Sequence, residues 1–287
     1  MILNDNMSTN QKKPLYSSTM FFGLTFLLTW IFWIPAGLLS KDHSPYANIL
    51  HYIGGAMPAM SALVLLYLYN DHKERKDYWQ RLVDFRRIGK FSWMMILFAV
   101  PILTITGIVG DIILGGTGAK LEFASTILSN PLSLLPFTLF MLVFGPLPEE
   151  MAWRGYALDG LHAKWNPLLA SLILGVAWTI WHLPLFLIEG SYQHGLGIGT
   201  LPFWLYMLDK IPQSIIMTWL FNNTQRSTVT AILFHFMINF FGELFNLSLR
   251  AETIYIASWW VTALLVVVLW KTQKNYCYVN PPNKVCP

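Results

Sequence analysis

Residues 132–158 read LSLLPFTLFMLVFGPLPEEMAWRGYAL, a long apolar run that ends in two adjacent acids and an arginine. Such a run is typical of a helix that crosses a lipid bilayer, which needs about 20 mostly apolar residues. Other parts of the chain meet or approach the same length. The predicted spans are residues 18–39, 47–69, 92–115, 132–148, 168–188, 202–221, 228–248 and 254–270.

The composition of the whole 287-residue chain agrees with a membrane protein. It is 55% hydrophobic and 12% charged, whereas soluble domains have about 25% charged residues. The net charge of +4 does not indicate nucleic acid, because no basic patch interleaved with aromatic residues lies on a soluble domain. We therefore predict an all-α, polytopic membrane helix bundle of about eight transmembrane helices, with the lipid bilayer as its partner. The oligomeric state cannot be read from these features.

Basic residues are divided unevenly between the two sides of the predicted bundle. Cytoplasmic loops carry an excess of Lys and Arg. Most of the 19 basic residues fall in the N-terminal segment, the C-terminal tail and the loops after the second, fourth and sixth spans, whereas Lys41, Lys120 and Arg250 lie opposite. We expect a multi-pass protein of the cell membrane with both termini cytoplasmic. The predicted parts are an N-terminal segment (1–17), a transmembrane bundle (18–271) and a C-terminal tail (272–287).

The longest polar interruption between spans is residues 71–90, DHKERKDYWQRLVDFRRIGK. Two interpretations remain open. It forms an amphipathic helix on the membrane surface, with Trp79, Leu82 and Phe85 facing the lipid, or it is a plain charged loop. The two cysteines, Cys277 and Cys286, lie in the tail and form neither a disulfide framework nor a zinc motif.

Ionisable side chains within a bilayer cost a few kcal/mol each, so they indicate a functional site. Glu149 and Glu150 follow the fourth apolar run, and Arg154 comes one turn later. Glu150 and Arg154 are spaced i, i+4 with the acid first, which is the favourable orientation for a helical ion pair. Glu149 is rotated by about 100° on the same helix, so it needs a different partner.

The fifth and seventh predicted spans each contain a histidine with a second residue of interest one helical turn away. Trp178 and His182 are spaced i, i+4 in the fifth span, and His235 and Asn239 repeat that spacing in the seventh. One such histidine is usually a packing residue, but hydrocarbon offers no other way to satisfy all these polar groups in three helices. A carboxylate and an imidazole are suited to deprotonating a water. A second imidazole and a carboxamide are suited to donating hydrogen bonds to an oxyanion.

The order EExxxR, then aromatic-xxx-His, then HxxxN over successive helices resembles the CPBP family, which includes type II CAAX prenyl endopeptidases and bacterial Abi proteins. The resemblance covers about residues 130–245, the expected protease core. Trp178 departs from the family pattern, which usually has Phe there. The resemblance implies an intramembrane endopeptidase with the candidate catalytic residues Glu149, Glu150, Arg154, His182, His235 and Asn239.

The resemblance also implies a role for each residue. Glu149 with His182 would activate a water, His235 and Asn239 would form the oxyanion site, and Glu150 with Arg154 would support the geometry. The implied substrate is a membrane-associated peptide or protein, either a prenylated CAAX-type peptide or a signalling peptide.

Whether a metal takes part is left open by the sequence. Family members are often labelled metalloproteases, and two histidines with carboxylates suit zinc. The HExxH motif is absent, however, so no cofactor is certain and direct action of the glutamate is favoured.

Three other functions are possible for a bundle with buried polar residues. A transporter is expected to contain inverted repeats or paired broken helices, and none is evident. A non-catalytic bacteriocin-immunity or binding protein would keep the same residues and so remains open. An aspartyl protease could use Asp111 and Asp209, but neither has the expected flanking residues, and Asp209 adjoins Lys210, which predicts a local ion pair.

The position of His182 sets the depth of the site. It lies about 14 residues past Leu168, where the fifth span begins, or roughly 20 Å along a helix. Glu149 must lie well within the bilayer to meet it. We therefore expect the fourth helix to continue past Glu150 towards Lys164, so that EExxxR is an intramembrane motif.

Overall fold

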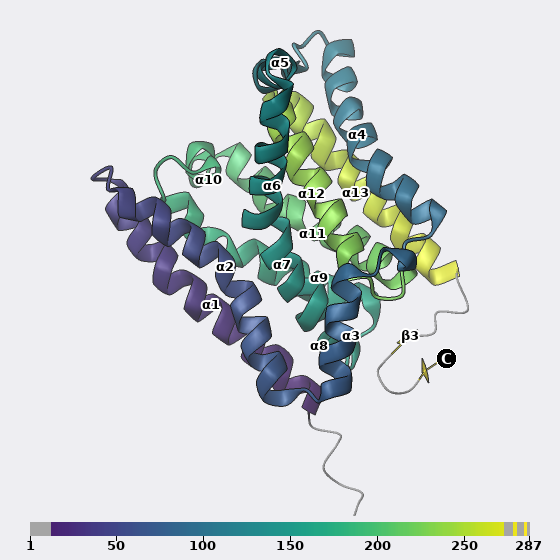
Figure 1. The fold of residues 1–287 in the computed structure, drawn as a ribbon. Helices are drawn as coiled ribbons and strands as arrows, with labels where there is room; N and C mark the ends of the chain where they lie inside the picture. The colour runs from purple at the N-terminus through teal and green to yellow at the C-terminus, as the bar shows by residue number, and fades with distance from the viewer. Residues whose placement is uncertain (1–12, 273–277, 280–283, 286–287) are drawn as a thin grey trace, which may run out of the picture.

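The computed structural model describes residues 13–272, 278–279 and 284–285, and these are mostly helical (Figure 1). The long helices are α1 (Lys13–Ser40), α2 (Pro45–Tyr69), α4 (Lys90–Ile113), α9 (Pro167–Trp181), α11 (Leu201–Asn223), α12 (Thr228–Leu244) and α13 (Leu249–Thr272). The shorter helices are α3 (His72–Val83), α5 (Glu122–Ser129), α6 (Leu134–Phe144), α7 (Pro146–Ala152), α8 (Leu158–His162) and α10 (Tyr192–Leu196).

Short elements connect these helices. They are the 3₁₀ turns η1 (Phe85–Arg87), η2 (Pro131–Ser133) and η4 (Leu183–Leu187), and the π-helical turn η3 (Trp153–Ala157). Strand β1 (Ala119–Lys120) pairs antiparallel with β2 (Asn246–Leu247), and β3 (Tyr278–Val279) with β4 (Lys284–Val285). The remaining residues of the predicted tails, including Cys277 and Cys286, lie outside the described residues.

Six stretches within the described residues are long and apolar enough to cross a membrane. The other two predicted spans are helical but differ from these six. α12 has 17 residues, and α11 carries Asp209, Lys210 and Gln213, which lower its mean hydropathy. The predicted all-α, polytopic architecture is confirmed. The six stretches are Ser18–Ser40, Pro45–Tyr69, Lys90–Ile113, Pro131–His162, Pro167–Leu187 and Leu249–Trp270.

Close packing joins the helices in pairs. α1 lies along α2, α9 along α11, and α13 along both α4 and α11, while α7 sits between α2 and α12 (Figure 1). Gly54 allows the first of these contacts, because a Cβ there would lie 2.3 Å from the Trp33 ring. Trp33 is buried and donates its indole N–H to the carbonyl of His51 at 2.8 Å.

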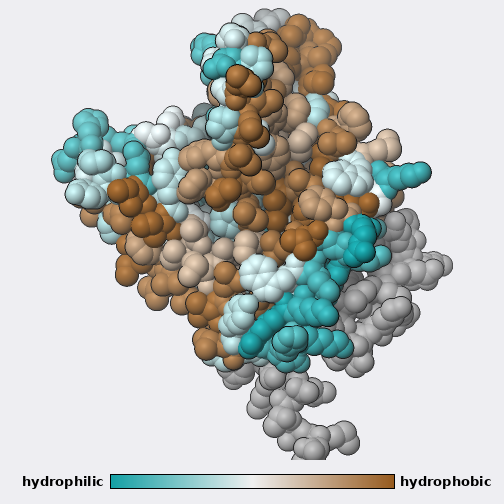
Figure 2. Space-filling model, in the orientation of Figure 1, coloured by the Kyte–Doolittle hydropathy of each residue, from teal (hydrophilic) through white to brown (hydrophobic). Residues whose placement is uncertain are grey.

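The outside of the bundle is largely apolar. Leu27, Ile105 and Leu264 are each more than half exposed, as expected for side chains that face hydrocarbon rather than water. Figure 2 shows this apolar surface and a hydrophilic band over α3. α1 begins and α13 ends at the same end of the bundle as α3 (Figure 1). Which side of the membrane this end faces remains a prediction.

Residues 72–83 form a helix, so this segment is not a plain loop, and its place on the membrane surface remains a prediction. Asp71 caps it by accepting from the backbone N–H of Glu74, whose carboxylate accepts from the N–H of Asp71, each at 2.9 Å. This reciprocal capping box stabilises the first turn. Trp79 and Phe85 are exposed as expected, but Leu82 packs against the core.

Candidate active site

The fourth predicted span is interrupted just before the two glutamates. Gly145 ends α6 with φ −139° and ψ −95°, and α7 begins at Pro146, where a proline loses no helical hydrogen bond. The helix continues past Glu150 as far as His162, as the sequence predicted. The π-helical turn Trp153–Ala157 follows directly after the glutamates, and such turns often occur at functional sites.

Glu150 binds two basic side chains. Arg154 Nη1 donates to its two carboxylate oxygens at 2.8 and 3.0 Å, which confirms the predicted ion pair. His235 Nδ1 lies 2.9 Å from Oε1, and Glu150 and Arg154 are fully buried. An ionised carboxylate only accepts hydrogen bonds, so Nδ1 of His235 carries the proton. Its Nε2 is left for another partner.

Glu149 has a different partner, as its rotation on the helix predicted. The indole N–H of Trp178 donates to Glu149 Oε2 at 2.6 Å. The other carboxylate oxygen, Oε1, makes no hydrogen bond to any residue that the structure describes. Glu149 is therefore buried and oriented by one bond, with one oxygen available to a substrate water.

Trp178 contacts most of the candidate residues. Its ring centroid lies 5.1 Å from that of His235 and 5.9 Å from that of His182, and Arg154 lies over the ring at 5.2 Å. The bond from Trp178 to Glu149 was not predicted from the sequence. The available signal was the presence of Trp where the family pattern has Phe, because the exchange adds a hydrogen-bond donor.

His182 caps the C-terminus of α9, just before the turn that contains Pro184. Its Nδ1 lies 2.7 Å from the carbonyl oxygen of Trp178. Because a carbonyl only accepts, Nδ1 is the protonated nitrogen, and Nε2 of the neutral ring keeps its lone pair. Within the described residues His182 meets Glu149 through Trp178 rather than through a direct hydrogen bond.

Asn239 lies one turn beyond His235 on α12, at the edge of the cluster. A Cβ on Gly145 would come within 3.2 Å of its Nδ2, so α12 passes close to the interruption before the glutamates. The carboxamide is half-buried and forms no hydrogen bond to the described residues. Its N–H groups are thus free to donate to a substrate.

Helix α3 braces the segment that carries the glutamates. Tyr78 donates its hydroxyl to the carbonyl of Met151 at 3.1 Å, and Arg81 Nη2 donates to the carbonyl of Gly155 at 2.9 Å. Arg81 also pairs with Asp159 at 3.0 Å. These bonds satisfy carbonyls around the π-helical turn, so α3 helps to hold the glutamates in place.

The two aspartates of the aspartyl-protease alternative have separate partners. Asp111 binds Arg250 and accepts from the hydroxyl of Ser248 at 2.8 Å. Asp209 lies 3.6 Å from the ammonium of Lys210, as the predicted local ion pair requires. No contact in the described structure joins Asp111 to Asp209, so the geometry does not provide an aspartyl dyad.

The candidate residues do not form a metal site as they are arranged. Among the described residues no three His, Cys, Asp or Glu side chains converge as metal ligands. Hydrolytic sites usually hold zinc with three protein ligands, and the described side chains do not supply such a set in this arrangement.

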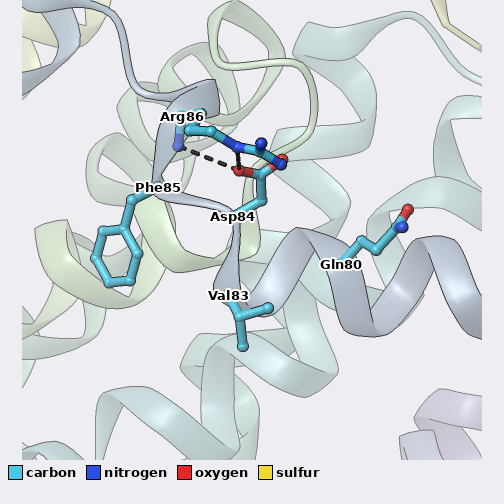
Figure 3. Close-up of a pocket in the computed structure, with 5 residues that line it drawn as sticks. All are labelled: Gln80, Val83, Asp84, Phe85 and Arg86. Carbon is cyan, nitrogen blue, oxygen red and sulfur yellow. Dashed lines mark hydrogen bonds and ion pairs between the residues drawn. The ribbon is translucent and has the colours of Figure 1, made fainter.

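A surface hollow lies beside α3, away from the cluster. Figure 3 shows the partly buried carboxylate of Asp84 accepting from the backbone and side chain of Arg86 there. These hydrogen bonds lower the pKa of Asp84. None of the candidate catalytic residues contributes to this hollow. Its lining residues are Gln80, Val83, Asp84, Phe85 and Arg86.

Comparisons with known proteins point to one family of membrane proteases. Residues 131–241 match the family described as type II CAAX prenyl endopeptidase Rce1-like, and this range contains all six candidate residues. A similar protein, CAAX prenyl protease 2 of Methanococcus maripaludis, is 28% identical over 257 residues, covering 88% of this chain and 94% of the relative. The chain is therefore similar to the Rce1-like family of type II CAAX prenyl endopeptidases over the region that contains the candidate residues.

Proposed function

We propose that this protein is an intramembrane endopeptidase that hydrolyses a peptide bond near the C-terminus of a membrane-associated, prenylated peptide. Similarity to the family supports intramembrane protease activity, and the name of the relative supports the CAAX-type substrate. A CAAX motif is a C-terminal sequence whose cysteine carries the prenyl group. The reaction must then take place at the depth of the lipid, where the buried polar cluster lies.

Glu149 is the proposed general base. Trp178 holds one carboxylate oxygen at 2.6 Å, which leaves the other to accept a proton from the attacking water. Nε2 of His182 is the proposed second acceptor that orients this water, since Nδ1 is committed to the Trp178 carbonyl. A positioned general base contributes about 10²- to 10⁴-fold to the rate.

His235 and Asn239 are the proposed donors to the oxyanion. Nδ1 of His235 donates to Glu150, and in the proposed role Nε2 also carries a proton, which it donates to the oxyanion. Asn239 adds a carboxamide N–H from the next turn. Preorganised donors of this kind stabilise the charge that develops on the attacked carbonyl. Arg154 balances the charge of Glu150 and holds it beside His235.

The proposed reaction uses only water and the side chains named above. The water oxygen forms a bond to the peptide carbonyl carbon as Glu149 takes one of its protons. The carbonyl oxygen then carries the negative charge between His235 and Asn239. When the tetrahedral intermediate collapses, the C–N bond breaks and Glu149 returns the proton to the leaving amine.

One observation carries the proposal more than any other. Glu149 and His182 bind opposite ends of the same residue, Trp178, through its indole N–H and its carbonyl, while His235 contacts the ring between them. Residues from α7, α9 and α12 thereby present a base, an acceptor and a donor to a common region. A packing role alone does not require this arrangement.

The reaction can be tested with purified protein in lipid nanodiscs and a farnesylated CAAX peptide, in water enriched in ¹⁸O. The expected result is one cleavage, with ¹⁸O in the new carboxylate. Glu149→Gln should abolish it, whereas Glu189→Gln, at an exposed position, should not. An intact peptide with the wild-type protein would overturn the proposed function.

A further inference from the structure

Helix α11 presents a buried polar face to the site that the proposed reaction does not use. Tyr206, Asp209, Lys210 and Gln213 are spaced i, i+3, i+4 and i+7, so they share one face of the helix. All four are buried, with exposed fractions of 9, 8, 9 and 0%. Charged groups at such positions are costly and usually mark a substrate path or site.

The ammonium group of Lys210 has unused hydrogen-bonding capacity. It lies 3.6 Å from Asp209 Oδ2, which is an ion pair but longer than a good hydrogen bond. It also lies 4.3 Å from the ring centroid of Tyr206 and 5.6 Å from that of Trp178. Aromatic faces stabilise a cation without taking up its N–H donors, so the donors of Lys210 that do not point at Asp209 can bind an anion.

Two acceptor atoms beside Lys210 also lack partners. Asp209 Oδ1 and Gln213 Oε1 are buried and form no hydrogen bond to the described residues. The other ends of these side chains are joined, because Gln213 Nε2 donates to Asp209 Oδ2 at 2.5 Å. Unpaired buried acceptors are costly, so this face is suited to a ligand that supplies both an N–H donor and an anionic acceptor.

This polar face is close to the proposed catalytic residues. Trp178, which holds Glu149, contacts both the ammonium of Lys210 and the ring of His235. The ring of Tyr206 lies 5.6 Å from that of His182. Three residues of extended peptide reach roughly 10 Å, so a peptide cut at the site could extend its C-terminus to this face.

We propose that Lys210 binds the free C-terminal carboxylate of the substrate, and that Gln213 Oε1 accepts the backbone N–H of the same terminal residue. This inference rests on the proposed function and adds the group that the enzyme recognises. A terminal residue supplies one N–H donor and one carboxylate, which matches the unpaired groups on α11. Asp209 holds the ammonium in place before substrate arrives and competes with the substrate carboxylate for it.

The test compares two farnesylated peptides that differ only in a C-terminal carboxylate or carboxamide. The wild-type protein should cleave the carboxylate peptide with a KM about tenfold lower, the size expected for a hydrogen bond between charged groups. Lys210→Met should remove this preference through KM rather than kcat. Lys210→Arg should retain it, as should the matched control Lys164→Met, at an exposed position.

Failure of the inference is distinct from failure of the proposed function. Equal KM values for the two peptides with the wild-type protein would overturn the inference even if Lys210→Met failed to fold. A preference that persisted in folded Lys210→Met would also overturn it, while Glu149-dependent cleavage would leave the proposed function intact. Absence of any cleavage by the wild-type protein would overturn both.

Discussion

At the scale of single residues, the two adjacent glutamates have different tasks. Glu150 is fully buried against Arg154 and His235, whereas Glu149 has one bond and a free oxygen. The roles implied by the family resemblance agree with these partners but remain proposals. Substitutions at the two positions should therefore differ in their effects on stability and on activity.

Glu150→Gln should destabilise the fold more than Glu149→Gln. It leaves the guanidinium of Arg154 buried without its counter-charge, and breaking a buried pair in this way costs about 3–5 kcal/mol. Thermal unfolding in detergent should show a clearly lower Tm for Glu150→Gln and a Tm near that of wild type for Glu149→Gln. Equal Tm values would contradict the assignment of Glu150 as the structural partner.

Trp178→Phe should reduce activity without unfolding the protein. The Phe ring keeps the aromatic contacts with His235 and His182 but removes the N–H that binds Glu149. A lost bond to a charged group is worth about 1.5–3 kcal/mol, so kcat/KM should fall roughly tenfold or more. An unchanged kcat/KM would show that the indole N–H does not position Glu149.

At the scale of helices, two adjacent glycines on α2 allow the packing of α1 on α2 to be tested with matched substitutions. A Cβ at Gly54 would lie 2.3 Å from the Trp33 ring, whereas a Cβ at Gly55 meets nothing within 4 Å. Gly54→Ala should therefore lower the Tm, because α1 and α2 must separate. Gly55→Ala should leave it equal or slightly higher, since Ala favours a helix by about 1 kcal/mol over Gly. The opposite order of Tm values would contradict the packing of α1 on α2.

Helix α3 should contribute to turnover although it lies outside the cluster. Tyr78→Phe removes the hydroxyl that binds the carbonyl of Met151, next to the glutamates. We expect kcat to fall several-fold with KM little changed, because the defect is in the placement of the base. Burial raises the pKa of Tyr78, so its hydroxyl stays protonated and this contribution persists at alkaline pH. A change confined to KM would contradict the bracing role.

At the scale of the whole molecule, much of the architecture was predictable from segment length and composition. The i, i+4 spacing predicted the Glu150–Arg154 pair, and the expected depth of His182 predicted that the helix continues past Glu150. These features depend on local periodicity, which a sequence displays directly. The lipid-facing surface follows from the same apolar runs.

Other features could not be predicted because they depend on contacts between distant segments. Two examples join residues that are far apart in the chain. They are the hydrogen bond from Trp178 to Glu149 and the ion pair between Asp111 and Arg250. The π-helical turn Trp153–Ala157 has no sequence marker of its own, and the charged sequence of α3 is compatible with both a helix and a loop. The orientation of the termini and the roles of the site residues remain predictions.

In the proposed mechanism, Glu149 drives peptide hydrolysis without a metal. The most direct measurement is kcat/KM for a farnesylated CAAX peptide with purified protein after exhaustive chelation, comparing wild type, Glu149→Gln and Glu189→Gln. We predict that chelated wild type and Glu189→Gln keep full activity, and that Glu149→Gln loses at least about 10²-fold, the contribution expected of a general base. Loss of wild-type activity on chelation, or a Glu149→Gln rate equal to that of Glu189→Gln, would contradict the claim.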